Sequence, residues 1–400
     1  SRNSRKRRIS VVIIEQVQES LRKSGLDGWL FFDHHRRDPL AYRILGIPDE
    51  VQATRRWYYF VPAEGEPRKL VHRIESGALD SLAGAKESYS SWTDQQQKLS
   101  ALVAGSSRIA MQYSPKCAIP YVSLVDAGTV ELIRGFGIEI VSSGDLIQDF
   151  EARWSEEQLT LHLEAGKLVD QVRSDAFDFL RSRIRSMEPV TEYEVQEFIL
   201  SRFSQFGLTR AHGPIVAVNA NASDPHYEPS RGKTSHIQRG DLVLIDLWAK
   251  LTKPNAVYYD STWTAFCGAT VPEQIQKVFE VVRNARKRAS SFVIRKASSQ
   301  ESVSGYEVDD VARDYIEGQG FGAFFFHRTG HSIGTDVHGT GANMDNLESH
   351  DERRVIARTC FSIEPGIYLP EFGIRSEVNV YVGDGFAQVT GEEQEDLVRI

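Results

Sequence analysis

Two neighbouring apolar segments each carry one acidic residue in their middle, and this pattern restricts how the chain can fold. Residues 240–249 (GDLVLIDLWA) are almost continuously apolar around Asp246, and residues 257–266 (VYYDSTWTAF) hold Asp260 within a β-rich run. A short polar turn separates them, which predicts a hairpin whose two carboxylates face each other, about 5 Å apart. Burying two acids side by side is costly unless a cation neutralises them. We therefore expect the chain to fold around a metal site.

Two further acids occur in apolar segments nearer the C-terminus. Glu364 lies in residues 360–368 (CFSIEPGIY), and residues 372–382 (FGIRSEVNVYV) alternate so that Arg375 and Glu377 share the polar face of a strand. A single acid in a strand is more often an exposed edge residue or a salt-bridge partner. Four acids in strongly apolar strands indicate one shared site.

Three of the 11 histidines of the chain lie within residues 327–339 (HRTGHSIGTDVHG). This cluster is consistent with a metal site, a proton-shuttling site, a histidine-rich surface loop or chance. The spacing of His327 and His331 would suit one face of a helix, but Gly330 and Gly334 disfavour a helix and favour a loop or irregular strand.

The acids and one histidine together suit a two-metal site. Four carboxylates and one neutral imidazole balance two divalent cations, and oxygen-rich ligation with one nitrogen favours Mn, Co, Fe or Zn. Two such ions about 3.5–4 Å apart can share a hydroxide that is nucleophilic at neutral pH. The expected chemistry is hydrolysis.

Length, charge and composition limit the number of domains, the partners and the location that the sequence predicts. A chain of 400 residues predicts two domains, and its formal net charge of −8 argues against nucleic-acid binding. The absence of a membrane-length apolar run, of a signal-peptide core and of paired cysteines predicts a cytoplasmic protein with no membrane contact. Five of the first eight residues are basic, which indicates a solvated tail more readily than a functional arm.

The expected domain boundary lies near residue 150. Residues 1–150 alternate amphipathic helices with short apolar strands, as in a small α/β domain, and a capping box at Ser155 opens a long amphipathic helix. Residues 191–213 and 304–330 both run from a Tyr-Glu-Val helix start to a histidine and glycine. These segments reflect either an internal duplication, with a site between its halves, or chance similarity of two capped helices.

The order Asp, Asp, His, Glu, Glu, with EPGIY and GIR-x-E around the last two acids, resembles the dinuclear metallopeptidases of the pita-bread fold. These include methionine aminopeptidase, Xaa-Pro aminopeptidase and Xaa-Pro dipeptidase (prolidase). The resemblance implies an α+β fold: a pita-bread catalytic domain with pseudo-two-fold symmetry in residues 151–400, after a smaller creatinase- and prolidase-like α/β domain in residues 1–150. The N-terminal domain points to the creatinase, aminopeptidase P and prolidase branch.

The same resemblance implies a role for each site residue. It implies two divalent ions, manganese foremost with cobalt, zinc or iron as alternatives, and a general base at Glu364. His226 and His338 correspond to catalytic histidines, and His327 matches a substrate-pocket histidine. Arg375 is assigned to substrate binding or to orienting Glu377. The implied metal ligands are Asp246, Asp260, His331, Glu364 and Glu377.

The implied function is hydrolysis of the Xaa-Pro bond of dipeptides or short peptides by a metal-bridged hydroxide. The alternatives are an Xaa-Pro aminopeptidase acting on longer peptides, a non-peptidase binding protein on the same fold, and a metallohydrolase that cleaves another bond. A dipeptidase needs a cation for the substrate carboxylate, and the candidates are Arg353, Arg354, Arg358 and Arg375.

Three residues around the predicted site residues depart from the family pattern. They are Trp248, two residues after Asp246, Gly339, directly after His338, and Val378, directly after Glu377. The branch also implies a homodimer in which an N-terminal loop approaches the partner's cleft. Residues 33–46 (DHHRRDPLAYRILG) are the candidate loop, although a solvated charge run explains its basic residues more simply.

Overall fold

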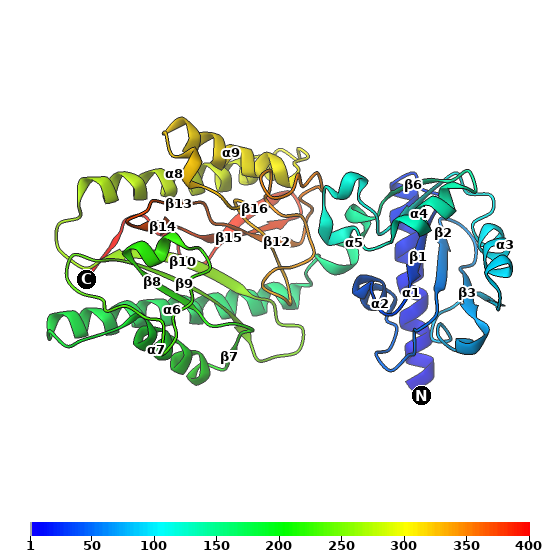
Figure 1. The fold of residues 1–400 in the computed structure, drawn as a ribbon, viewed down its shortest axis with the longest axis horizontal. Helices are drawn as coiled ribbons and strands as arrows, with labels where there is room; N and C mark the ends of the chain where they lie inside the picture. Colours follow the sequence, from blue (N-terminus) through cyan, green and yellow to red (C-terminus); the bar gives the residue numbers. More distant parts are fainter. Residues whose placement is uncertain (1) are drawn as a thin grey trace. The chain divides into compact units, whose positions relative to one another are not determined.

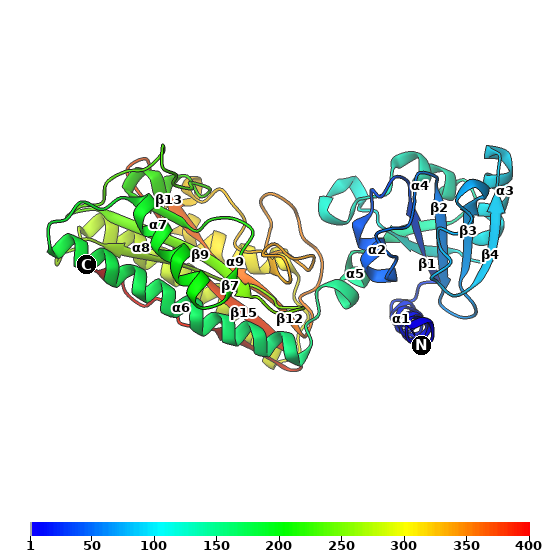
Figure 2. The same cartoon turned by 90° about the horizontal axis from the view of Figure 1, so that it is seen from below.

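The protein divides into two compact units, residues 1–151 and residues 152–400 (Figures 1 and 2). This computed structural model describes the backbone of residues 2–400 and the side chains of residues 13–400. The basic side chains predicted to form a solvated tail lie outside the described residues. None of the described helices combines the length and the apolar character needed to cross a bilayer.

The first unit is a six-stranded mixed sheet with helices on both faces. Its strand order is β4-β3-β2-β1-β5-β6, in which β1, β3, β4, β5 and β6 run parallel and β2 runs opposite. The elements in chain order are α1 (Arg2–Lys23), β1 (Gly28–Asp33), α2 (Pro39–Leu45), β2 (Trp57–Pro62), β3 (Arg68–His72), β4 (Ala85–Tyr89), α3 (Trp92–Leu102), β5 (Arg108–Met111), α4 (Ala127–Arg134), β6 (Glu139–Ser142) and α5 (Gly144–Glu151).

The central strand β1 is buried on both faces because its alternate side chains enter two different cores. Trp29 and Phe31 pack with α1, α2 and α5, whereas Leu30 and Phe32 pack with α3 and α4. This arrangement explains why β1 reads as an uninterrupted apolar run. Because all strands except β2 run in the same direction, their carboxyl ends lie at one edge of the sheet.

The second unit repeats one order of elements. A long helix precedes a 14-residue helix in each half, and the shorter helices α7 and α9 begin with capping boxes in which the backbone N–H groups of Thr191 and Ser304 donate to Glu194 and Glu307. The repeat agrees with the internal duplication considered from the sequence. The predicted capping box at Ser155 is present at the start of α6. The helices are α6 (Glu156–Arg185), α7 (Glu192–Gln205), α8 (Glu273–Ser298) and α9 (Gly305–Gly318).

Three small sheets lie between these helix pairs, with the helices on the outside (Figure 1). Helices α6 and α7 pack on β9 and β10, and α8 and α9 pack on β12 and β15. The strands are β7 (Leu208–Thr209), β8 (Ile215–Val218), β9 (Leu242–Leu251), β10 (Tyr259–Phe266), β11 (Ser332–Ile333), β12 (Thr359–Ile363), β13 (Gly366–Tyr368), β14 (Gly373–Arg375), β15 (Val378–Gly383), β16 (Phe386–Thr390) and β17 (Val398–Arg399).

The predicted hairpin forms from β9 and β10, but its register differs from the prediction. Asp246 pairs with Thr262 and Asp260 pairs with Trp248, so the two acids are diagonal neighbours instead of directly opposed. Both still lie on the face that points away from α6, because Val243, Ile245 and Leu247 occupy the face that packs on it. Residues 252–258 connect the two strands.

The predicted single strand over residues 372–382 is wrong. The chain forms β14 and β15 in two different sheets, and Ser376 and Glu377 lie in the break between them. The backbone N–H of Glu377 donates to the Thr262 carbonyl at 3.1 Å, so the break brings Glu377 beside β10.

Candidate metal centre

Three side chains predicted as metal ligands converge from segments far apart in the sequence. Asp260 in β10, His331 before β11 and Glu377 after β14 each place one potential ligand atom within 4.8 Å of the others. All three residues are buried. Glu364, directly after β12, joins them through its Oε1, which lies 3.3 Å from His331 Nε2.

The orientation of His331 leaves its Nε2 directed at the acids. Its Nδ1 lies 3.0 Å from the Ser332 carbonyl, which can only accept, so Nδ1 carries the proton. Nε2 then presents a lone pair 3.6 Å from Asp260 Oδ2 and 3.3 Å from Glu364 Oε1. A cation between these atoms would satisfy all three acceptors.

Asp246 lies beside the cluster and is paired with Arg375. The Arg375 guanidinium donates to Asp246 Oδ2 at 2.7 Å and to the Tyr368 hydroxyl at 3.0 Å, and it lies 3.9 Å from Glu364 Oε2. Glu377 instead accepts from the Thr262 hydroxyl at 2.7 Å. The Arg375 Nε also donates to the Thr262 hydroxyl, at 3.4 Å, so Arg375 and Glu377 are linked through Thr262. That Arg375 orients Glu377 stays a prediction.

Three carboxylate oxygens in this site are buried without a hydrogen-bond partner: Asp246 Oδ1, Asp260 Oδ1 and Glu377 Oε1. A buried carboxylate oxygen with no donor is strongly destabilising, so native proteins rarely leave several together. Hard oxygen donors with one imidazole nitrogen form the donor set that divalent transition metals bind. The residues present thus fit a metal centre.

The electrostatics of the cluster support the same conclusion. Burial, together with the charge of Asp246, raises the pKa of Asp260 well above its usual value, and burial beside Asp260 does the same to the pKa of Glu377. Burial raises the pKa of Glu364 to about 6, against the opposing effects of His331 and Arg375. These acids resist ionisation together unless positive charge is supplied.

Backbone packing around the cluster fixes the positions of Asp260 and His331. Asn379 accepts from the Asp260 N–H at 3.0 Å and donates to the Asp260 carbonyl at 2.7 Å, which fixes β10 against β15. A Cβ at Gly330 would lie 1.8 Å from the Ser362 carbonyl oxygen, so only glycine permits the close approach that places His331.

A cavity of about 630 Å³ opens onto these residues and contains the three further histidines singled out from the sequence. His226 and His338 line it and are exposed, and the His338 ring lies edge-on to His331 at 4.3 Å between ring centroids. His327 also lines the cavity. Its Nε2 lies 2.6 Å from the Tyr368 hydroxyl, and burial and the nearby Arg375 lower its pKa to about 3.

The cavity also contains residues that sequence reasoning missed. Arg328 and Glu348 line it, and Tyr368 links His327 to Arg375. Of the arginines predicted to hold a substrate carboxylate, Arg375 lines the cavity but is bound to Asp246, and Arg353 is buried against Asp351. The proximity of Arg328 to the histidine cluster in sequence was the one available signal for it.

The three departures from the family pattern have separate structural settings. Trp248 lines the cavity, opposite Asp260 in the hairpin. A Cβ at Gly339 would lie 2.8 Å from Ser332 Oγ, so the loop as folded has no room for a larger residue there without a shift. Val378 packs in the hydrophobic core under α8.

Comparison with solved structures identifies the fold. A dipeptidase, PepE, of Mycobacterium ulcerans superposes with a TM-score of 0.68 at 23% identity, covering 98% of each chain. A prolidase of Thermococcus sibiricus superposes with a TM-score of 0.59 at 23% identity, covering 97% of this chain and 98% of that one. The predicted pita-bread fold is confirmed.

Sequence comparison adds two curated relatives. An Xaa-Pro dipeptidase of Lactobacillus delbrueckii subsp. lactis is 29% identical over 253 residues, and the matched region spans 63% of each chain. An Xaa-Pro dipeptidase of Pyrococcus furiosus is 28% identical over 256 residues, or 63% of this chain and 67% of that relative. The model of metallopeptidase family M24 matches residues 160–384, which is more than half of the chain. The matched region includes the four acids and the one histidine of the candidate metal centre. The chain belongs to this family of metallopeptidases.

Proposed function

We propose that the chain is an Xaa-Pro dipeptidase that hydrolyses the bond before proline in dipeptides. The observation that carries the proposal is the group of three buried, unpartnered carboxylate oxygens around the Nε2 of His331. The names of the curated relatives supply the substrate class. Residues 1–151 form the creatinase- and prolidase-like N-terminal domain in this proposal. Manganese as the native metal, a homodimer and a cytoplasmic location stay predictions from the resemblance.

The metal ions would be held by Asp246, Asp260, His331, Glu364 and Glu377. When bound, two divalent ions would supply Lewis acidity that activates water and polarises the scissile carbonyl. Glu364 would accept the proton of the attacking water at a carboxylate oxygen, since its Oε1 lies 3.3 Å from His331 Nε2 in the cluster. His226 donates to the oxyanion, and His338 lies along the substrate backbone. Arg375 donates to Asp246 Oδ2 and orients that carboxylate, so we assign it positioning in place of the predicted substrate binding.

Paired hydrolysis assays test the function. The metal-stripped protein should cleave neither Ala-Pro nor Ala-Pro-Ala, and Mn(II) should restore cleavage of the dipeptide. Restored cleavage of the tripeptide would instead show an Xaa-Pro aminopeptidase. Two bound metals with no cleavage of either peptide would contradict the proposal and favour a binding protein on this fold.

We further propose that Arg328 binds the carboxylate of the dipeptide. Arg328 lines the same cavity as His331 and Glu364 and directly follows His327 in the chain, so it places a cation at the wall of the site. Loss of a charge-assisted hydrogen bond costs about 1.5–3 kcal/mol, or roughly tenfold to a hundredfold in binding. Arg328→Gln should therefore raise KM for Ala-Pro at least about tenfold and leave KM for Ala-Pro amide nearly unchanged.

Arg354→Gln is the matched control, because Arg354 is an exposed arginine that does not line the cavity. Its KM for both compounds should equal that of the unmodified protein. Equal effects of Arg328→Gln on the acid and the amide would show that Arg328 acts on something other than the carboxylate.

A further inference from the structure

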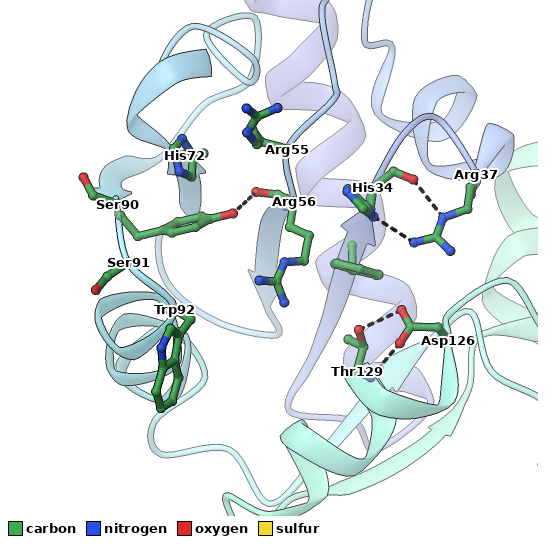
Figure 3. Close-up of a pocket in the computed structure, with 12 residues that line it drawn as sticks. His34, Arg37, Arg55, Arg56, His72, Ser90, Ser91, Trp92, Asp126 and Thr129 are labelled. Carbon is green, nitrogen blue, oxygen red and sulfur yellow. Dashed lines mark hydrogen bonds between the residues drawn. The ribbon is translucent and has the colours of Figure 1, made fainter.

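The N-terminal unit has a cavity of its own, of about 560 Å³, formed entirely by residues of that unit (Figure 3). It lies where strands β1, β3 and β4 end and β2 begins, at the carboxyl edge of the parallel strands. Small ligands of α/β sheets bind at this edge, near the point where the strand order reverses. Here the order reverses beside β1, whose Phe32 lines the cavity.

The cavity is strongly cationic. Arg37, Arg55 and Arg56 line it, and no ion pair involves any of them within the described side chains. Asp126 is the acid in its lining, and its carboxylate is already engaged by the backbone N–H of Thr129 at 2.9 Å and by the Thr129 hydroxyl at 2.8 Å. Three guanidinium charges against one carboxylate leave a net charge of +2.

The loop that carries Arg37 is held in place. Asp33 accepts from the N–H groups of Arg36 and Arg37 at 2.8 and 2.7 Å, and the Arg36 guanidinium donates to three backbone carbonyls. His35 and Arg36 both adopt positive φ, at 61° and 55°. The side chains of His35, Arg36 and Arg37 are exposed, as the predicted solvated charge run requires, while these hydrogen bonds hold the backbone of the loop.

His34 adds a hydrogen-bond donor to the same cavity. Its Nδ1 lies 3.0 Å from an Arg37 guanidinium nitrogen, which can only donate, so the neutral imidazole carries its proton on Nε2. His72, Ser90 and Ser91 also line the cavity. Figure 3 shows Arg56 projecting into the middle of the view, with His34 and Arg37 on one side of it and His72, Ser90, Ser91 and Trp92 on the other.

An aromatic surface lies at the rim. Trp92, the first residue of α3, is 68% exposed although it is a large apolar side chain, and it lines the cavity with Ser91. An exposed indole beside arginines is a surface on which a planar ring can stack. The volume lies within the range of small-molecule sites and exceeds what a bare inorganic anion needs.

We propose that this cavity binds a phosphomonoester that carries an aromatic ring, with the phosphate dianion among Arg37, Arg55 and Arg56 and the ring on Trp92. The net charge of +2 matches a dianion, and guanidinium forks suit phosphate oxygens. The inference uses no residue of the metal centre and does not depend on the proposed peptidase function.

Calorimetric titration of the metal-loaded, full-length protein with adenosine monophosphate tests the proposal. Adenosine, inorganic phosphate and benzoate are the comparison probes. Adenosine monophosphate should bind saturably, at least about tenfold more tightly than any of them. Arg37→Gln and Arg55→Gln should each weaken binding about tenfold or more, and Trp92→Ala about tenfold.

Arg108→Gln is the matched control, since Arg108 is an exposed arginine at the start of β5, paired with Glu139. It should bind adenosine monophosphate as the unmodified protein does, and all four variants should keep the unmodified melting temperature. Several results would overturn the proposal: no saturable binding below about 1 mM, tighter binding of benzoate, or affinity unchanged in Arg37→Gln and Arg55→Gln. The last result would place the phosphate elsewhere, the metal centre included.

Discussion

Asp260→Asn is expected to abolish peptide hydrolysis and metal retention together. Asp260 lies between His331 and Glu377 in the cluster, and its Oδ1 has no protein partner, so a neutral amide removes both charge and a ligand atom. Losing several kcal/mol of the transition-state stabilisation that the metal ions would supply corresponds to a fall in kcat/KM of about 10³-fold or more. Steady-state assays with Ala-Pro and elemental analysis of the dialysed protein measure the two effects.

The same variant should gain stability without metal. Burial and the charge of Asp246 raise the pKa of Asp260, which shows that its ionised form is disfavoured in the metal-free site. Asparagine keeps the shape and removes that charge. Metal-free Asp260→Asn should therefore melt above the metal-free unmodified protein, while added Mn(II) should raise the melting temperature of the unmodified protein alone.

Asp336→Asn serves as the control for this experiment. Asp336 lines the same cavity but is exposed and lies outside the ligand cluster. Its variant should retain both metals and change kcat/KM by no more than a few-fold. Full activity and two bound metals in Asp260→Asn would remove Asp260 from the site.

The acids of the hairpin could be singled out from the sequence because one physical conflict marks them, whereas the choice of His331 among the three clustered histidines came from the family resemblance. Asp246 and Asp260 interrupt strands that are otherwise apolar, and an isolated charge is too costly to bury without a reason. That argument requires only strand periodicity. The structure brings Asp260 together with His331 and Glu377, and Asp246 is the diagonal neighbour of Asp260 in the hairpin. The two-unit organisation is similarly visible as a change from short alternating elements to a long capped helix at Ser155.

The partners of the ligands could not be predicted in the same way. Asn379 binds the backbone of Asp260, 119 residues away, and Tyr368 bridges His327 and Arg375. Such contacts depend on how separate sheets pack, and no local pattern records that packing. Alternation along residues 372–382 predicted one continuous strand, whereas the chain breaks at Ser376 and Glu377. Arg375 therefore binds Asp246 directly and is linked to Glu377 through the Thr262 hydroxyl.

Arg375→Met is expected to cause the largest loss of stability. The Arg375 side chain is buried and donates to Asp246 and Tyr368, so methionine would leave the Asp246 carboxylate in the interior without its cation. Breaking a buried ion pair from one side costs about 3–5 kcal/mol. Urea denaturation of the metal-free protein should show a fall in the free energy of unfolding of about that size.

Arg375→Lys distinguishes positioning from charge alone. Lysine keeps a cation near Asp246 but cannot donate to Asp246 and Tyr368 in the same fork. Metal affinity should therefore fall about tenfold to a hundredfold, as expected when a group that orients a ligand is altered. The kcat of this variant should recover at saturating Mn(II) while KM for Ala-Pro stays unchanged, because Arg375 acts through Asp246 and not on the peptide.

Arg354→Met provides the matched control, since exposed substitutions usually change stability by no more than about 0.5 kcal/mol. A raised KM in Arg375→Lys at saturating metal would restore Arg375 as a substrate-binding residue, as the sequence first indicated. Unchanged stability and metal affinity in Arg375→Met would mean that the Asp246 carboxylate does not depend on the Arg375 guanidinium for its place in the site.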